Sequence, residues 1–249
     1  MCKPVGSWAV VRYWLDSADA ARDAAEADGV ETHALFGAAR GCDVFEQRLL
    51  RFVGSGGERR DDARDEVLYV LEGTGSATVG RELHELAAGT GLFVARGTPW
   101  RVEASEGLRL LSVLVNEPRP AGRPHAIVRG AERRGATAGR QYTLLATPES
   151  GCESVTQFVG HIPPGRAPDH FHTYDEVVYV LSGEGALHID GDSAPLRPGA
   201  CVYLPARLVH CLENFGPGEM DVLGVFRPAG SPAEAYYPDG RLAVVPGGE

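Results

Sequence analysis

Two segments of the chain read almost alike: EVLYVLEGTG at residues 66–75 and EVVYVLSGEG at residues 176–185. The offset between them is 110 residues, and it persists downstream without a gap, aligning Gly89 with Gly199 and Trp100 with His210. Self-similarity at a fixed offset is typical of a structural unit that occurs more than once. We therefore predict two related units, over roughly residues 5–115 and 125–228.

Each unit is built from short β-type runs separated by glycine and proline. The first unit contains FEQRLLRFV, EVLYVLEG, SATVG, GLFVA and LRLLSVLV, and the second SVTQFVGHI, EVVYVLSG, ALHIDG, ACVYLP and MDVLGVF. Many short strands with turn signals between them indicate a β-sandwich or β-barrel. Only residues 17–29, SADAARDAAEADG, read as a helix, with Ser17 as the N-cap and Gly29 ending it. The predicted fold class is all-β, with two tandem barrels and one short N-terminal helix.

The segment NEPRPAGRPH, residues 116–125, separates the two units. Its prolines suit a semi-rigid linker. We therefore place the first barrel at residues 1–115, the linker at 116–125, and the second barrel with a C-terminal tail at 126–249.

The composition narrows the class of protein. Of 249 residues, 43% are hydrophobic and 23% charged, which is typical of a globular chain, and no apolar run approaches the ~20 residues of a membrane span. The start lacks the apolar stretch of a signal peptide, and five cysteines without a CxxC pair indicate a reduced compartment, so we expect a cytoplasmic protein without membrane contact. The net charge of −10 disfavours nucleic acid. Abundant Arg, Ala and Gly indicate a GC-rich, bacterial genome. A small molecule is the expected partner, and a homodimer is left open.

Metal-ligating residue types gather in the second unit, in GRAPDHFHTYDEVVYVLSG (165–183) and GACVYLPARLVHCLEN (199–214). Residues two apart on an extended strand face the same way, so His170 and His172 project together, and Glu176 can rejoin that face after a short bend. Closing the sheet brings His210 of the later strand beside them. Three imidazoles and one carboxylate could thus converge inside one barrel. A buried histidine cluster satisfied by hydrogen bonds is the alternative.

These two segments resemble the two sequence motifs of the cupin superfamily. The residues that match are Gly165, His170, His172, Glu176 and Gly183 in the first motif, and Gly199, Pro205, His210 and Asn214 in the second. Two departures stand out: the first gap is one residue short, and Arg207 occupies the place of a motif glycine. The resemblance implies a double-stranded β-helix (jelly-roll) barrel that holds one divalent metal with three His and one Glu. Fe, Mn, Ni, Co and Zn all suit such donors.

The first unit keeps only part of this set. At the same offset it has Arg60, Asp62 and Trp100 in place of the three histidines, while Glu66 remains. Arginine cannot ligate a metal, and indole offers no usable lone pair. We therefore expect a degenerate barrel in which Arg60 pairs with a carboxylate and Trp100 fills the interior. Binding of an organic anion by Arg60 is the alternative.

The expected function is that of a metal-dependent enzyme acting on a small polar metabolite, with Glu176 and His210 in the chemistry. The resemblance favours dioxygenase-like oxidation. Isomerase or aminohydrolase chemistry of the ureidoglycine aminohydrolase type, or binding without catalysis, are the alternatives. Three further residues, Gln157, Tyr203 and His161, lie on strands expected to approach the metal. Arg207 either meets an anionic substrate at the entrance or is a solvated loop residue.

Overall fold

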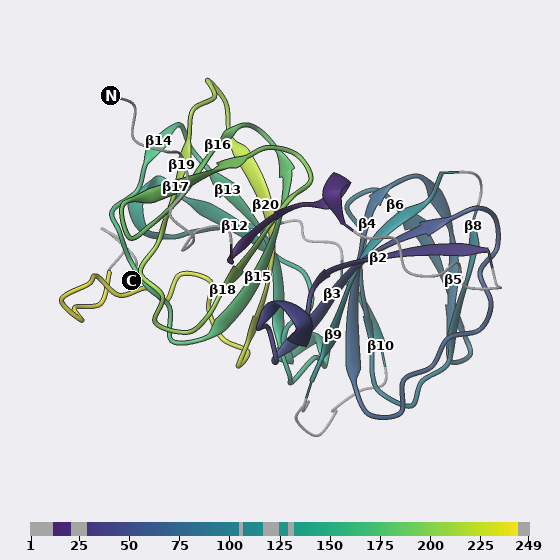
Figure 1. Ribbon diagram of the computed structural model, residues 1–249. Helices are drawn as coiled ribbons and strands as arrows, with labels where there is room; N and C mark the ends of the chain where they lie inside the picture. Colours follow the sequence, from purple (N-terminus) through teal and green to yellow (C-terminus); the bar gives the residue numbers. More distant parts are fainter. Residues whose placement is uncertain (1–11, 21–28, 105–106, 117–124, 129–131, 244–249) are drawn as a thin grey trace.

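A computed structural model describes residues 12–20, 29–104, 107–116, 125–128 and 132–243. Figure 1 shows two β-barrels side by side, which confirms the all-β prediction. The strands before the linker are β1 (Trp14–Asp16), β2 (Val30–Phe36), β3 (Phe45–Phe52), β4 (Asp65–Glu72), β5 (Thr74–Val79), β6 (Glu82–Ala87), β7 (Gly91–Val94), β8 (Trp100–Ala104) and β9 (Arg109–Val115). They are followed by β10 (His125–Val128).

The remaining strands belong to the second barrel. They are β11 (Arg133–Gly135), β12 (Gln141–Leu144), β13 (Thr156–Ile162), β14 (Gly165–Arg166), β15 (Asp175–Ser182), β16 (Gly185–Ile189), β17 (Asp192–Leu196), β18 (Ala200–Leu204), β19 (Cys211–Asn214) and β20 (Met220–Arg227). Asp190 and Gly191 join β16 to β17 with φ of 50° and 82°, the left-handed values that a two-residue hairpin turn requires.

Each barrel consists of a large and a small antiparallel sheet packed face to face. In the second barrel the order β1-β18-β15-β20-β13-β12-β11 packs on β14-β19-β16-β17. In the first, β10-β7-β4-β9-β3-β2 packs on β6-β5-β8. Apolar side chains fill the space between the two sheets of each barrel, and Trp100 is among those that fill the first.

Each barrel also lends one strand to its neighbour. β1 pairs with β18 of the second barrel, although it precedes the first barrel in the chain. β10 pairs with β7 of the first barrel, although it begins at the last residue of the linker and runs into the second unit. The boundaries drawn from the sequence assign β1 to the first barrel and nearly all of β10 to the second, which is the reverse of how the two strands pair. The sequence pattern identifies a strand but not its partner, and an open sheet edge is stabilised by any strand that can pair with it.

The two large sheets pack against each other through a third apolar core. It contains side chains from both barrels, among them Val67 and Tyr69 of β4 and Val177 and Tyr179 of β15. These strands are therefore buried on both faces, one against their own barrel and one against the other. This is the physical reason for the unbroken apolar runs that first identified the repeat.

The described residues contain only short 3₁₀ helices: Ser17–Asp19, Ala38–Arg40, Thr137–Gly139 and Pro148–Ser150. The first begins where the N-terminal helix was predicted, but its N-cap is Asp16, whose carboxylate accepts a hydrogen bond from the N–H of Ala18. Residues 21–28 of the predicted helix lie outside the described residues. No helix in the described ranges is long and apolar enough to cross a membrane.

Candidate metal centre

Backbone pairing brings the three histidines together. His170 and His210 form an antiparallel bridge, in which each N–H donates to the carbonyl of the other at 3.0 and 2.8 Å. His172 lies two residues beyond His170 and shares its face, as an extended segment requires. The ring centroids are 5.1 Å apart for His170 and His172, 4.7 Å for His170 and His210, and 5.3 Å for His172 and His210.

Backbone carbonyls orient all three rings. The Nδ1 atom of His170 lies 2.9 Å from the carbonyl oxygen of Pro168, and that of His210 lies 2.9 Å from the carbonyl oxygen of Leu208. His172 Nδ1 lies 2.7 Å from the carbonyl of Glu234, in the C-terminal tail. A carbonyl only accepts, so Nδ1 carries the hydrogen and the Nε2 lone pair stays available.

One potential ligand atom from each of these rings lies within 4.8 Å of those of the other two. Rings held in this way by hydrogen bonds at the far nitrogen are characteristic of metal-binding histidines. These hydrogen bonds engage only Nδ1 of each ring, so the arrangement fits a metal better than a histidine cluster satisfied by hydrogen bonds.

Burial sets the charge state of the centre. It lowers the pKa of His170 to about 3 and of His172 to about 4, and it holds the pKa of His210 well below its usual value, so the rings are neutral. Burial raises the pKa of Glu176 to about 8. Glu176 lies on β15 and lines the same pocket as the three rings. A buried carboxylate beside three neutral imidazoles is a donor set that a divalent cation complements.

Gly224 of β20 provides the room for Glu176. A Cβ atom at this position would lie 2.7 Å from Glu176 Oε1 and 2.3 Å from Cε1 of Phe158. Both distances are far below a van der Waals contact. Among the described residues, none donates a hydrogen bond to the Glu176 carboxylate. The glycine therefore leaves this carboxylate space without giving it a partner.

An aromatic wall of Tyr174 and Phe226, which the sequence did not predict, supports the centre. Tyr174 stacks on the His172 ring, with centroids 4.7 Å apart and planes 8° apart, and on Phe226 at 4.0 Å and 20°. The signal was present in the sequence, because Tyr174 falls at even spacing between His172 and Glu176 and so shares their face.

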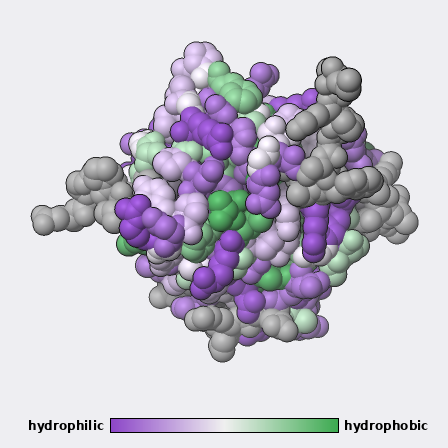
Figure 2. Space-filling view, turned by 60° about the vertical axis from the view of Figure 1, so that its left-hand side comes forward, coloured by the Kyte–Doolittle hydropathy of each residue, from purple (hydrophilic) through white to green (hydrophobic). Residues whose placement is uncertain are grey.

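The C-terminal tail docks against its own barrel. Tyr236 pairs with Phe171 through two 2.9 Å backbone hydrogen bonds, and their rings stack. Tail residues from Pro232 to Ala243 contribute to the wall of a pocket of about 820 Å³, mouth included. Figure 2, which brings the second-barrel side forward, shows a mostly hydrophilic surface with several small hydrophobic areas, one of them central.

Another pocket residue absent from the predicted site is Arg140. It immediately precedes β12 and lines the pocket together with the three histidines and Glu176. Its Nη2 atom donates to the carbonyl of Leu212 at 2.9 Å. A lone arginine outside both motifs reads as a surface residue. The one sequence signal for Arg140 is that the equivalent position of the first unit, 110 residues earlier, is the apolar Val30.

Two of the residues predicted to approach the metal face the other way. Cross-strand partners share a face, and Tyr203 and Gln157 are in register with Val177 and Val225, which pack against the first barrel. Gln157 Nε2 donates to the carbonyl of Leu68 in that barrel at 3.3 Å. The prediction for these residues was wrong because both faces of their strands are apolar, so the pattern does not select a face.

His161 lies on this same outer face of β13. Its Nδ1 atom is 2.8 Å from Asp221 Oδ1 and its Nε2 atom 3.0 Å from Thr143 Oγ1. His161, Glu219 and Asp221 form a second histidine–carboxylate group, but both ring nitrogens of His161 are engaged. The residue therefore does not approach the metal centre as predicted.

Arg207 is exposed and adopts φ of 68°, the left-handed conformation that favours a glycine. Its backbone N–H donates to the carbonyl of His172 at 2.7 Å. The backbone at this position thus keeps the turn expected of the motif glycine. The side chain fits the solvated-loop alternative.

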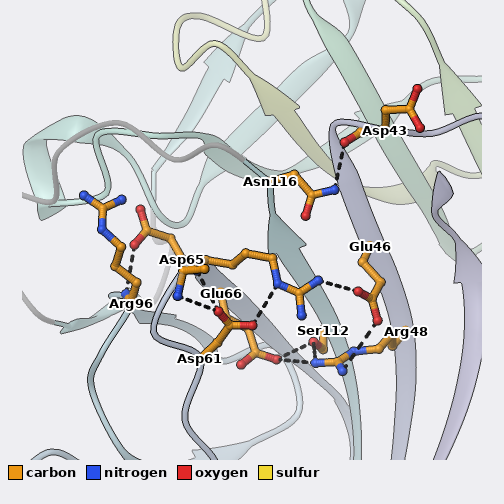
Figure 3. A network of polar contacts seen from close by, with 11 residues as sticks. Asp43, Glu46, Arg48, Asp61, Asp65, Glu66, Arg96, Ser112 and Asn116 are labelled. Carbon is orange, nitrogen blue, oxygen red and sulfur yellow. Dashed lines mark hydrogen bonds and ion pairs between the residues drawn. The ribbon is translucent and has the colours of Figure 1, made fainter.

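The corresponding region of the first barrel holds an ionic network instead (Figure 3). Arg48 Nη2 lies 3.2 Å from Glu66 Oε1, and Ser112 donates to the same oxygen. The predicted pairing of Arg60 is confirmed, since its Nε lies 2.6 Å from Asp62 Oδ1, although both side chains are exposed. Trp100 is buried in the barrel interior as predicted.

Comparison with known proteins agrees with this fold. A family model described as "Cupin domain" matches residues 53–114 and 158–226, together more than half of the chain. The crystal structure of protein Ylba from E. coli superposes with a TM-score of 0.72 at 14% identity, covering 86% of this chain and 89% of that one. A point mutant of Bacillus subtilis oxalate decarboxylase gives a TM-score of 0.71 at 14% identity, covering 91% of this chain and 79% of that one. At these identities the likeness shows the fold alone.

Curated relatives match over shorter stretches. Polyketide synthase CurC of Streptomyces cyaneus is 31% identical over 100 residues, 39% of this chain and 65% of that protein. L-ectoine synthase of Aliivibrio fischeri is 31% identical over 77 residues, 30% and 60% respectively. An oxalate-binding protein of Thermotoga maritima is 32% identical over 66 residues, 26% and 54%. The chain thus spans a little over half to two thirds of the length of these relatives, and they include proteins named as enzymes.

Proposed function

Since the chain belongs to the cupin family, we propose that it is a metal-dependent enzyme whose centre is formed by His170, His172, His210 and Glu176 in the second barrel. The observation that carries this proposal is the orientation of the rings. Each presents Nδ1 to a backbone carbonyl and leaves Nε2 for a ligand. A cluster built only for packing would not require three rings turned in the same way.

A divalent metal at this centre would supply a Lewis acid and, if it were iron, a site for O2 chemistry. Fe, Mn, Ni, Co and Zn all accept mixed imidazole and carboxylate donors. Bacillus subtilis oxalate decarboxylase, which has a similar fold, contains Mn(II) centres, and this supports a metal here without identifying it.

For the reaction we propose dioxygenase-like oxidation, in which both atoms of O2 enter the substrate and no external reductant is needed. The pocket supports this choice over hydrolysis. Its walls are largely apolar, with Phe158, Tyr174 and the tail beside the histidines, so it suits an apolar gas such as O2. The three neutral histidines and Glu176 would hold the metal, and the aromatic side chains beside them would position the substrate.

Reconstitution tests the reaction class. Protein loaded anaerobically with Fe(II) is expected to consume O2 only when substrate is present, measured with an oxygen electrode against a panel of small carboxylates and ketones. Turnover by the Mn(II)- or Zn(II)-loaded protein without O2 would replace oxidation by isomerase or aminohydrolase chemistry. Saturable ligand binding without turnover under either condition would indicate a binding protein.

A further inference from the structure

Arg140 lines the pocket in which a ligand of the metal centre would bind. It follows the 3₁₀ helix Thr137–Gly139, and its side chain reaches the pocket that His170 and Glu176 also line. Its guanidinium donates a single hydrogen bond to the described residues, from Nη2 to the carbonyl of Leu212. Guanidinium carries five N–H donors in a planar fork, so this bond leaves most of its donor capacity for a ligand.

The charges in the pocket call for an anion. Arg140 brings a positive charge into the pocket that the three histidines and Glu176 also line. Glu176 is the only carboxylate among the described lining residues. A divalent cation bound there would take up that negative charge and leave the site doubly positive. A buried cation without a partner is costly, so an anionic ligand would stabilise the loaded centre.

The repeat gives an independent reason to assign Arg140 to the site. In β2 and β3, Glu31 is in register with Arg51, and in β12 and β13, Gln141 is in register with His161. Both pairs obey the same offset, so Arg140 corresponds to Val30. Val30 is fully buried in the apolar core of the first barrel. The barrel without the histidines therefore also lacks the arginine.

The other residues of the pocket wall indicate what the uncharged part of the ligand is like. Apolar side chains dominate it, from Tyr142, Phe158, Ile162, Val178, Leu204 and Leu212. Such a surface stabilises an aromatic or alkyl group and offers little to a compact, fully polar anion. A pocket that combines one cation with apolar walls matches a molecule with one charged end.

We propose that Arg140 binds the carboxylate of the substrate, and that the substrate is a small monocarboxylate with an aromatic or alkyl body. A guanidinium pairs with a carboxylate through two parallel N–H···O bonds, which fixes both the position and the orientation of the ligand. The metal's place in the reaction rests on the proposed function, whereas binding of the carboxylate is tested separately.

The test uses benzoate as probe, with benzamide and acetate as matched comparisons. Binding is measured by calorimetry on full-length wild type and Arg140→Gln, each in metal-free and Zn(II)-loaded form, with Zn(II) content determined alongside. Arg133→Gln is the control, because Arg133 pairs with Glu219 at 2.9 Å on the surface and does not line the pocket. Thermal unfolding checks that each variant is folded, and Arg140→Lys is the second variant.

We expect the Zn(II)-loaded wild type and Arg133→Gln to bind benzoate at least about tenfold more tightly than benzamide or acetate. Arg140→Gln should lose that preference and keep its Zn(II), and Arg140→Lys should recover part of the affinity. Equal benzoate affinity in wild type and Arg140→Gln, or no binding of benzoate to the loaded wild type, would overturn the inference. Wild type that binds benzoate through Arg140 but retains no Zn(II) would leave the inference standing and contradict the proposed function instead.

Discussion

The two barrels carry the same strands but treat the same glutamate in opposite ways. In the first barrel, Glu66 is paired with Arg48 and Ser112. In the second, Glu176 accepts no hydrogen bond from a described residue and faces a pocket with three imidazoles. Both barrels keep the glutamate, so this residue alone does not distinguish the barrel proposed to hold a metal from the other. The difference lies in what surrounds the carboxylate.

Strand register identifies the residues responsible. Arg48 is in register with Ser112, and Phe158 with Gly224. The two pairs are equivalent because Glu66 pairs with Leu114 and Glu176 with Phe226, so the offset is 112 residues on the last strand of each barrel. The first barrel therefore has an arginine where the second has a phenylalanine, and a serine where the second has the glycine that leaves room for Glu176. These two exchanges supply Glu66 with a cation and a donor, which take the place of a metal. The first barrel thus differs from the second in two ways: its glutamate is paired internally, and it lacks the three histidines.

The largest expected effect is on metal content, which should fall when a histidine of the second barrel is replaced and not when the equivalent residue of the first barrel is replaced. His172→Ala should lose bound metal on dialysis, from about one ion per chain to a small fraction of that, because it removes one of the ligands. Trp100→Phe, at the equivalent of His210, should keep its metal. Elemental analysis of both variants measures this, and loss of metal from the Trp100 variant would show that the site had been assigned to the wrong barrel.

The next effect concerns the ion pair of the first barrel. Arg48→Met leaves the buried Glu66 carboxylate without its cation and should cost about 3 kcal/mol in the free energy of unfolding. Adding Glu66→Gln should restore most of that loss, because the stranded charge is removed as well. Urea unfolding of the double-mutant cycle measures the coupling. Metal content should stay at its wild-type value throughout, and a fall would show that the first barrel also serves the centre.

A smaller effect is expected where the second barrel is changed toward the first. Gly224→Ser introduces the side chain that the first barrel has, and it should displace Glu176 and Phe158 and weaken metal binding by about 10- to 100-fold. Gly218→Ser is the matched control, because a Cβ there meets nothing within 4 Å. Metal affinity from competition with a chelator is the readout, and an unchanged value in Gly224→Ser would mean that the carboxylate is not a ligand.

The smallest expected effect tests the exchanged strand β1. The N–H of Ala18 and the guanidinium of Arg197 hold the pKa of Asp16 below its usual range. Its contribution to stability is therefore present above the unfolded-state pKa of about 4 and is lost as the pH falls through the lower folded-state value. Asp16→Asn should lower the unfolding midpoint at pH 7 by less than about 4 °C. The difference from wild type should shrink below a pH of about 4, and a difference that grew there would contradict this account.

The sequence predicted those features that depend on spacing. The offset of 110 residues revealed both barrels, and the cupin resemblance it supported is confirmed. The spacing of two residues on an extended segment predicted that His170 and His172 share a face, and in the structure their rings lie side by side. Both results follow from periodicity within a segment.

What the sequence did not predict depends on pairing between segments. Gln157 and Tyr203 lie on strands buried on both faces, so hydrophobicity could not decide which face meets the pocket. The exchange of β1 and β10 requires knowledge of partner strands, and Arg140 enters the pocket from outside both motifs. Register, which is a tertiary property, decides all three.

The central claim is that the chain holds a single metal ion, in the second barrel. The most direct measurement combines the metal stoichiometry of purified, reconstituted protein with X-ray absorption at the metal edge, on wild type and on His170→Ala/His172→Ala. We predict about one ion per chain in an imidazole-rich shell, lost in the double variant. No bound metal in the wild type, or a full equivalent that persists in the double variant, would contradict the account.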